Sequence, residues 1–173
     1  MTDRQRLYTG RIITLEVEEA TLPNGLQSRF EIIGHPGGAA VVPVDSDGRV
    51  CLLRQYRHVA QSWLWEVPAG KLDGRPAEVT ARLELAEEAG LEAGHLDSLG
   101  TLWTSPGLYT EVVHLYLATA LRAVAARPEP DEVLEIHWIP LQDALRAALD
   151  GTYTDAKTVV ALVRAADRLG IRR

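Results

Sequence analysis

The sequence predicts a mixed α+β domain that carries a small β-rich N-terminal appendage. Two observations lead to this prediction. Segments typical of strands enclose one central helical segment, and further helical segments follow towards the end of the chain. The stretch Pro36-Gly37-Gly38 interrupts the pattern after the first strands, so we expect an appendage over residues 1–36 and a larger domain over residues 37–173.

The composition is that of an ordinary soluble globular domain. The chain has 173 residues, of which 46% are hydrophobic and 24% are charged, so it can bury a core without a metal or a disulfide. No apolar run reaches the roughly 18 residues of a membrane span, and we expect no secretory signal. The net charge of −6, without a basic block, argues against nucleic-acid binding. The single Cys51 fits a cytoplasmic protein.

The appendage is predicted from two extended runs joined by a turn. Residues 12–17 are rich in β-branched side chains, and Pro23-Asn24-Gly25 favours a turn before a second run over residues 28–33. A ribbon of two strands is only marginally stable in water. We therefore expect this segment to pack against something else.

The larger domain begins with apolar strands. Residues 39–44 and 50–56 flank Asp45-Ser46-Asp47-Gly48, a turn signal that predicts a hairpin between them. A further strand is expected over residues 63–67, where Pro68 ends it. The remaining elements that we expect are strands over 99–104, 112–119 and 132–138 and helices over 141–149 and 156–169.

The central helix is predicted from Pro76 to Ala89. Pro76 suits the first helical position and Gly90 suits the position just past the end. Apolar residues at spacings of four and three predict the face that packs on the core: Val79, Leu83 and Ala86.

Three glutamates lie on the other side of this predicted helix. Glu84, Glu87 and Glu88 stand at i, i+3 and i+4. They could form a solvated acidic face, but Glu84 has Glu88 at i+4 and Glu88 has Glu92, and each such pair costs on the order of 0.2–0.5 kcal/mol. Crowded carboxylates become favourable around a divalent cation, and oxygen ligands suit Mg²⁺ or Mn²⁺.

The segment around these glutamates resembles the Nudix box, G-x5-E-x7-R-E-U-x-E-E-x-G-U, in which U is a bulky aliphatic residue. Residues 84–91 fit without a gap. Upstream the segment is one residue short, Arg75 takes the place of the first glutamate, and Leu83 takes the place of the arginine. The two missing charges are of opposite sign, so we interpret them as a structural pair lost together. Arg82 is the candidate substitute, although it points about 100° around the helix.

Outside the box, the chain resembles the ADP-ribose pyrophosphatase branch of the Nudix family. The resemblance rests on residues 53–58 before the box, on residues 66–70 at its entry, and on Pro106, which lies 15 residues beyond Leu91. It implies an α/β/α sandwich with a mixed sheet, and Mg²⁺-dependent hydrolysis of ADP-ribose to AMP and ribose 5-phosphate. Taken alone, Ser105-Pro106-Gly107 would be read as a turn between strands.

The same resemblance implies a set of metal ligands and a catalytic base. Glu84 and Glu88 are expected as the principal ligands, Glu87 as the ligand or catalytic support of a second ion, and the carbonyl of Ala69 as another ligand. In this branch the general base is usually an acidic residue on a loop after the box. The candidates here are Glu129, Asp131, Glu132 and Glu135, and we favour Glu132.

Substrate contacts are expected on both sides of the box. Arg57 is the best candidate to bind the diphosphate, because a guanidinium offers several donors in a fixed fork. Arg54 is a second candidate, but residues three apart on a strand face opposite sides. Tyr8 is a candidate for stacking on adenine. Further contacts implied by the resemblance are Lys71, Ser105, Gly107 and Glu111.

The partners implied by this interpretation are a nucleoside-diphosphate sugar and a second copy of the chain. In the resembling enzymes the appendage completes the substrate site of the other subunit, so we expect a homodimer. Two alternatives stay open. The chain could hydrolyse another nucleotide derivative, such as FAD or a GDP-sugar, or it could be a Nudix-like module that binds its ligand without turnover.

Overall fold

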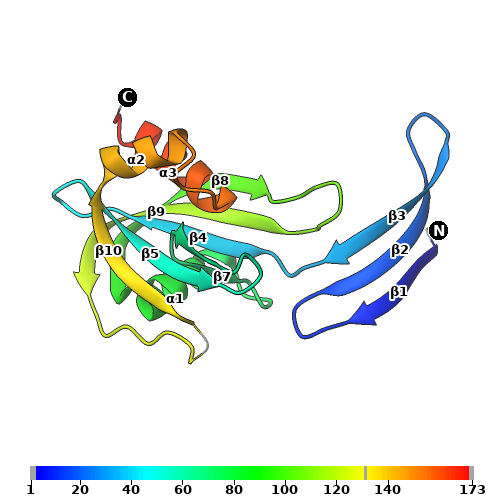
Figure 1. The fold of residues 1–173 in the computed structure, drawn as a ribbon, viewed down its shortest axis with the longest axis horizontal. Helices are drawn as coiled ribbons and strands as arrows, with labels where there is room; N and C mark the ends of the chain where they lie inside the picture. The colour runs from blue at the N-terminus through cyan, green and yellow to red at the C-terminus, as the bar shows by residue number, and fades with distance from the viewer. Residues whose placement is uncertain (1–2, 131, 172–173) are drawn as a thin grey trace.

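The fold is described by a computed structural model, which covers residues 3–130 and 132–171. The N-terminal part is a three-stranded antiparallel sheet of order β1-β2-β3, which projects away from the rest of the molecule (Figure 1). Its strands are β1 (Asp3–Thr9), β2 (Thr14–Thr21) and β3 (Gln27–Gly34). The two expected runs correspond to β2 and β3, and β1 is a third strand that the sequence pattern did not indicate.

The rest of the chain is built on two further sheets. One has the order β7-β4-β9-β8 and the other the order β10-β5-β6. Their strands are β4 (Gly38–Pro43), β5 (Arg49–Arg57), β6 (Ser62–Glu66), β7 (Ala69–Lys71), β8 (Leu91–Trp103), β9 (Val112–Ala123) and β10 (Leu134–Pro140). β4 and β9 are parallel whereas the other pairs are antiparallel, so the larger sheet is mixed.

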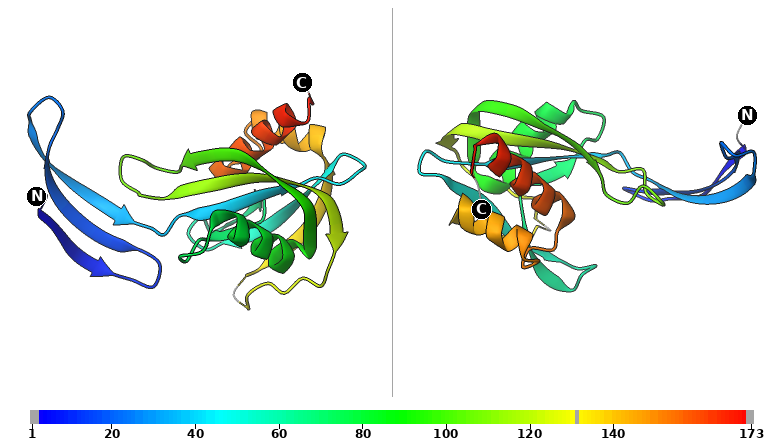
Figure 2. Two further views of the ribbon diagram at one scale, coloured as in Figure 1. Left: turned by 180° about the vertical axis from the view of Figure 1, so that it is seen from behind. Right: turned by 90° about the horizontal axis from the view of Figure 1, so that it is seen from above.

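Helices cover both sides of these sheets. They are α1 (Ala77–Ala89), α2 (Leu141–Leu149) and α3 (Ala156–Arg168). α2 and α3 lie together and pack on a core that includes Leu52, Leu115 and Leu162, whereas α1 packs on a second core that includes Val41 and Leu85 (Figure 2). This arrangement confirms the predicted α+β fold. None of the helices in the described part of the chain has the length and apolar character that crossing a membrane requires.

The predicted hairpin between the first two strands of the larger domain is wrong. β4 and β5 belong to different sheets, and a single bridge between Val44 and Val50 is what joins them. The turn itself forms, since the N–H of Asp45 donates to the carbonyl of Arg49 and Gly48 adopts a φ of 75°. β4 is flanked by β7 and β9 on its two edges, so neither edge is left for β5.

The predicted core face of the central helix is also wrong. Val79 is 45% exposed, whereas the buried face contains Ala81, Leu85 and Glu88. Apolar residues occur all around this helix, so their spacing alone does not identify the side that packs. The end of the helix follows the prediction, because Gly90 adopts the left-handed conformation and donates its N–H to the carbonyl of Ala86.

Candidate active site

Two of the three glutamates on α1 face the short strand β7. The N–H of Ala69 donates to Glu88 Oε2 at 2.8 Å, and the side chain of Glu88 is 2% exposed. Glu84 lies against Gly70 so closely that a Cβ at position 70 would lie 1.8 Å from Glu84 Oε1. Glycine is therefore what admits the Glu84 carboxylate here. Glu87 is exposed on the adjacent face of the helix.

Burial and mutual repulsion perturb both inward-facing carboxylates. Burial, together with the charges of Glu84 and Glu132, raises the pKa of Glu88 to about 8, although the Ala69 N–H opposes the shift. Burial and the charges of Glu87 and Glu132 raise the pKa of Glu84 to about 7. Such crowding is relieved either by protonation or by a bound cation.

The donor set fits a hard divalent cation. Carboxylate oxygens of Glu84, Glu87 and Glu88 and the carbonyl oxygen of Ala69 are ligands of the kind that Mg²⁺ and Mn²⁺ prefer. Across residues 3–130 and 132–171, no three His, Cys, Asp or Glu side chains already converge as a closed metal shell.

The structure brings Glu132, the favoured candidate for the base, to this cluster. Its charge acts on both Glu84 and Glu88, and its Oε2 accepts a hydrogen bond of 2.7 Å from the N–H of Glu129. Glu135 lies 3.8 Å from Arg54 and 3.2 Å from the His137 ring. Asp131, another candidate, lies outside the described residues.

The two candidate arginines of β5 lie on opposite faces of the strand. Arg57 Nε and Nη2 donate to the two carboxylate oxygens of Glu66 at 2.7 and 2.8 Å, and the charge of Glu88 acts on Arg57. Arg54 instead stacks over the Trp63 ring at 5.6 Å. Within one chain, Arg57 is therefore brought to the glutamates and Arg54 is not.

Two basic residues act on Glu84 through their charges. The charges of Arg75 and Lys71 both lower its pKa, against the stronger effects that raise it, so both cations lie close to the cluster. At the position that departs from the Nudix box, Arg75 thus supplies a positive charge that acts on Glu84, and its Nη2 lies 3.8 Å from Asp73 Oδ2. Arg82 does not replace the missing arginine, because its guanidinium donates to Glu78 at 3.0 Å on the exposed side of α1.

The loop of residues 105–111 supplies the remaining predicted contacts. Ser105 and Gly107 are exposed in a turn, and Glu111 Oε1 lies 3.3 Å from His35 Nδ1. Burial lowers the pKa of His35, the Glu111 charge opposes the shift, and the Lys71 charge adds to it. Glu111 and Lys71 therefore both lie near His35, at the junction between the N-terminal sheet and the larger domain.

Two residues near Arg57 had no role in the sequence analysis: Glu66, which contacts Arg57, and Lys157, which contacts Glu66. Glu66 is 2% exposed and holds Arg57, and Lys157 Nζ donates to the same carboxylate from α3. Glu66 and Lys157 are 91 residues apart in the sequence. Because the two residues are so far apart, no local motif indicates that they are in contact. Glu66 itself lies within residues 66–70 at the entry to the box, but this segment did not indicate a role for it.

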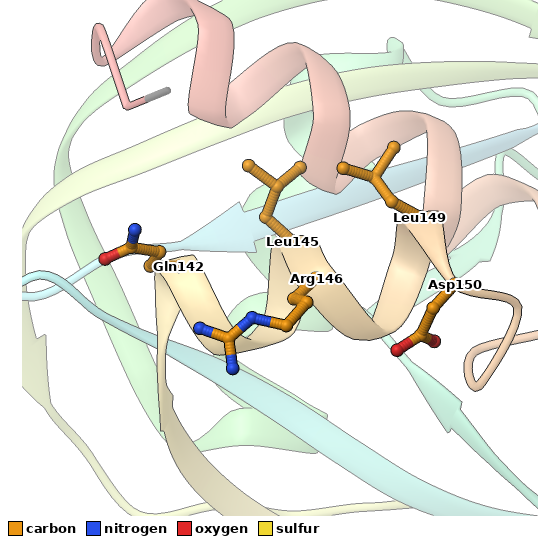
Figure 3. A pocket seen from close by; sticks show the side chains of 5 residues that line it. All are labelled: Gln142, Leu145, Arg146, Leu149 and Asp150. Carbon is orange, nitrogen blue, oxygen red and sulfur yellow. The ribbon is translucent and has the colours of Figure 1, made fainter. Parts of the chain in front are cut away.

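Two surface hollows lie elsewhere. One, of about 260 Å³, is lined by residues of α2 and by Asp150 just after it, as Figure 3 shows: Gln142, Leu145, Arg146, Leu149 and Asp150. The other, of about 400 Å³, is lined by Leu99 and by residues of α3. Neither hollow contains a predicted site residue.

Comparison with known protein families identifies the family to which this fold and its acidic helix belong. The model of the NUDIX domain matches residues 34–162, so the chain belongs to the Nudix family of hydrolases. The predicted family membership is confirmed.

Particular relatives cover most of the chain. An ADP-ribose pyrophosphatase of Bacillus subtilis is 38% identical over 162 residues, which are 92% of this chain and 88% of the relative. An ADP-ribose pyrophosphatase of Mycobacterium tuberculosis is 37% identical, with 92% and 79% covered. A GDP-mannose pyrophosphatase of Cronobacter sakazakii is 35% identical, with 79% and 77% covered.

A solved structure has the same fold. The crystal structure of an ADP compounds hydrolase superposes with a TM-score of 0.84, covers 98% of this chain and 94% of its own, and is 23% identical in sequence. The likeness therefore extends over the N-terminal sheet as well as the larger domain.

Proposed function

We propose that this protein hydrolyses ADP-ribose to AMP and ribose 5-phosphate. The observation that carries the proposal is the pair Glu84 and Glu88, held against Ala69 and Gly70 with pKa values raised to about 7 and about 8. Relatives with the name ADP-ribose pyrophosphatase, at 37–38% identity over nearly the whole chain, support the choice of substrate.

A divalent cation, Mg²⁺ or alternatively Mn²⁺, is the proposed cofactor. Glu84, Glu87, Glu88 and the carbonyl oxygen of Ala69 would hold it. When bound, such a cation screens the charge of a diphosphate and makes water a better nucleophile. The cation would also relieve the repulsion among the carboxylates.

The other side chains of the site have separate proposed roles in the hydrolysis. Water attacks one phosphorus, the P–O bond to the bridging oxygen breaks, and the proposed base Glu132 accepts a proton from the attacking water. Arg57 would bind the diphosphate through a guanidinium that is 42% exposed. The other proposed substrate contacts are Lys71, Ser105, Gly107 and Glu111. Arg54 would contribute from the opposite face of its strand, outside this cluster.

The N-terminal sheet is proposed as a dimerisation element over residues 1–36. The sheet is joined to the larger domain by short links such as the hydrogen bond from the Thr110 N–H to the Ile33 carbonyl, and it exposes Leu7, Tyr8 and Leu26 by 53%, 58% and 63%. A second copy would cover this surface and bring Tyr8 towards the partner's substrate. Light scattering should give about twice the 19.0 kDa of one chain. A monomer at micromolar concentration would contradict the proposal.

A substrate panel tests the proposed activity. The protein is incubated with ADP-ribose, FAD, NADH and GDP-mannose, with and without Mg²⁺, and the products are identified. We expect AMP and ribose 5-phosphate from ADP-ribose, in the presence of the cation. The Glu88→Gln variant tests the ligand assignment, since it removes the charge of the side chain and keeps its size. Unchanged activity of this variant at saturating Mg²⁺ would remove Glu88 from the proposed ligands.

Two other candidates are kept for specific reasons. Hydrolysis of a GDP-sugar is favoured by the relative named GDP-mannose pyrophosphatase, and the panel decides between the substrates. A module that binds without turnover is favoured by the departures at Arg75 and Leu83. Calorimetry that detects ADP-ribose binding with Mg²⁺, in a protein that forms no products, would support it. A cytoplasmic location stays a prediction.

A further inference from the structure

The proposed diphosphate-binding arginine is one end of a chain of alternating charges. Arg57 binds both oxygens of Glu66. Lys157 Nζ donates to the Glu66 carboxylate and also, at 3.0 Å, to Asp155 Oδ2. Two cations and two carboxylates therefore alternate from β5 through β6 to the start of α3. Their charges balance, which allows Glu66 to be almost fully buried.

Glu66 fixes the direction of the Arg57 guanidinium. The two hydrogen bonds engage Nε and Nη2. Nη1 forms no hydrogen bond with the described residues, so its donors are free. A carboxylate that receives bonds from two cations and is 2% exposed cannot swing into solvent. Arg57 is thus held in one orientation, with the charge of Glu88 acting on it.

The start of α3 fixes Glu66 and the backbone beside it. Asp155 caps the helix by accepting from the Thr158 N–H at 3.0 Å. Thr158 Oγ1 accepts from the Val67 N–H at 2.9 Å. Two residues further on, the Ala69 N–H donates to Glu88, so the segment from Glu66 to Ala69 is held by α3 at one end and by α1 at the other.

We propose that Glu66 and Lys157 are positioning residues for substrate binding: Lys157 holds the buried Glu66, and Glu66 aims Arg57 at the diphosphate. This inference rests on the proposed function, since it takes the diphosphate as the ligand of Arg57. It adds that a residue of the C-terminal helix, outside the Nudix box, sets the affinity for the substrate. The effect should therefore fall on KM more than on kcat.

The test compares two residues of α3, Lys157 and Arg164, whose side chains each bind another element. Lys157→Met removes the ion pair with Glu66, and Lys157→Arg keeps the positive charge. Arg164→Met is the matched control, because Arg164 Nη1 ties α3 to the Leu99 and Thr101 carbonyls at 3.0 Å, on the β8 side. For each variant, kcat, KM for ADP-ribose, the thermal midpoint and the calorimetric affinity for inorganic pyrophosphate with Mg²⁺ are measured. Glu66→Gln is measured in the same way.

We expect Lys157→Met and Glu66→Gln to raise KM and weaken pyrophosphate binding by about tenfold, with kcat within about threefold of the wild type. Lys157→Arg should restore KM, and Arg164→Met should lower the thermal midpoint without changing KM. Unchanged KM and pyrophosphate affinity in Lys157→Met, or an equal rise of KM in Arg164→Met, would overturn the inference. A wild-type protein that does not hydrolyse ADP-ribose would refute the proposed function instead, and the pyrophosphate titration would then test the inference by itself.

Discussion

Gly70→Ala should separate the activity of this protein from its stability. The added Cβ would lie 1.8 Å from Glu84 Oε1 and 2.2 Å from Glu84 Cδ, so the carboxylate must retreat by roughly 1.2 Å to reach the shortest tolerable contact. The atoms that move are the far end of a flexible side chain, so the fold should tolerate the change. A displacement of this size at a reacting centre costs on the order of 100-fold in rate.

The assay is Mg²⁺-dependent hydrolysis of ADP-ribose, measured beside thermal unfolding. We expect Gly70→Ala to reduce kcat by about 100-fold while the unfolding midpoint changes by only a few degrees. Gly94→Ala in β8 is the control, since its added Cβ would meet the Ala120 Cβ at 3.0 Å, away from the glutamates. Full activity in Gly70→Ala would refute the assignment of Glu84 as a ligand that needs the space at position 70.

Three further predictions concern pH, the base and the dimer. Because the folded-state pKa values of Glu84 and Glu88 lie above their usual 4.5, the folded state binds more protons, and the metal-free protein should lose stability as the pH rises from about 5 to 8. Added Mg²⁺ should then raise the melting temperature more at pH 8 than at pH 5.5, and an equal rise at both would contradict this account. Glu132→Gln should lower kcat by about 100-fold while leaving Mn²⁺ affinity, measured by electron paramagnetic resonance, unchanged; lost affinity would make Glu132 a ligand. Leu7→Asp combined with Leu26→Asp should convert the proposed dimer to a monomer in light scattering, because charged side chains would enter the proposed apolar contact.

The elements with strong local signals could be predicted from the sequence. The helix over residues 141–149 has the predicted bounds, and the central helix ends at Ala89, just before Gly90, as expected. The pairing of strands could not be predicted in the same way. The turn at residues 45–48 indicated a hairpin, but the edges of β4 are occupied by β7 and β9, which lie far away in the sequence.

The same distinction between local patterns and distant contacts applies to the candidate site. Glu84 and Glu88 were visible because their spacing on one helix is local, and the spacing of Arg54 and Arg57 already indicated opposite faces. The face of α1 that packs was mispredicted, because alanine and leucine surround the helix and Glu88 itself is buried. The contact between Glu66 and Lys157 joins residues 91 positions apart, so it depends on how α3 docks against the sheet.

The central claim is that the carboxylates of α1 bind a divalent cation beside Ala69. Crystals grown with Mn²⁺ test it most directly, through the anomalous signal of the metal. We predict a peak within ligand distance of carboxylate oxygens of Glu84 and Glu88 and of the Ala69 carbonyl oxygen. A map with no peak there, at a Mn²⁺ concentration that supports full activity, would contradict the claim.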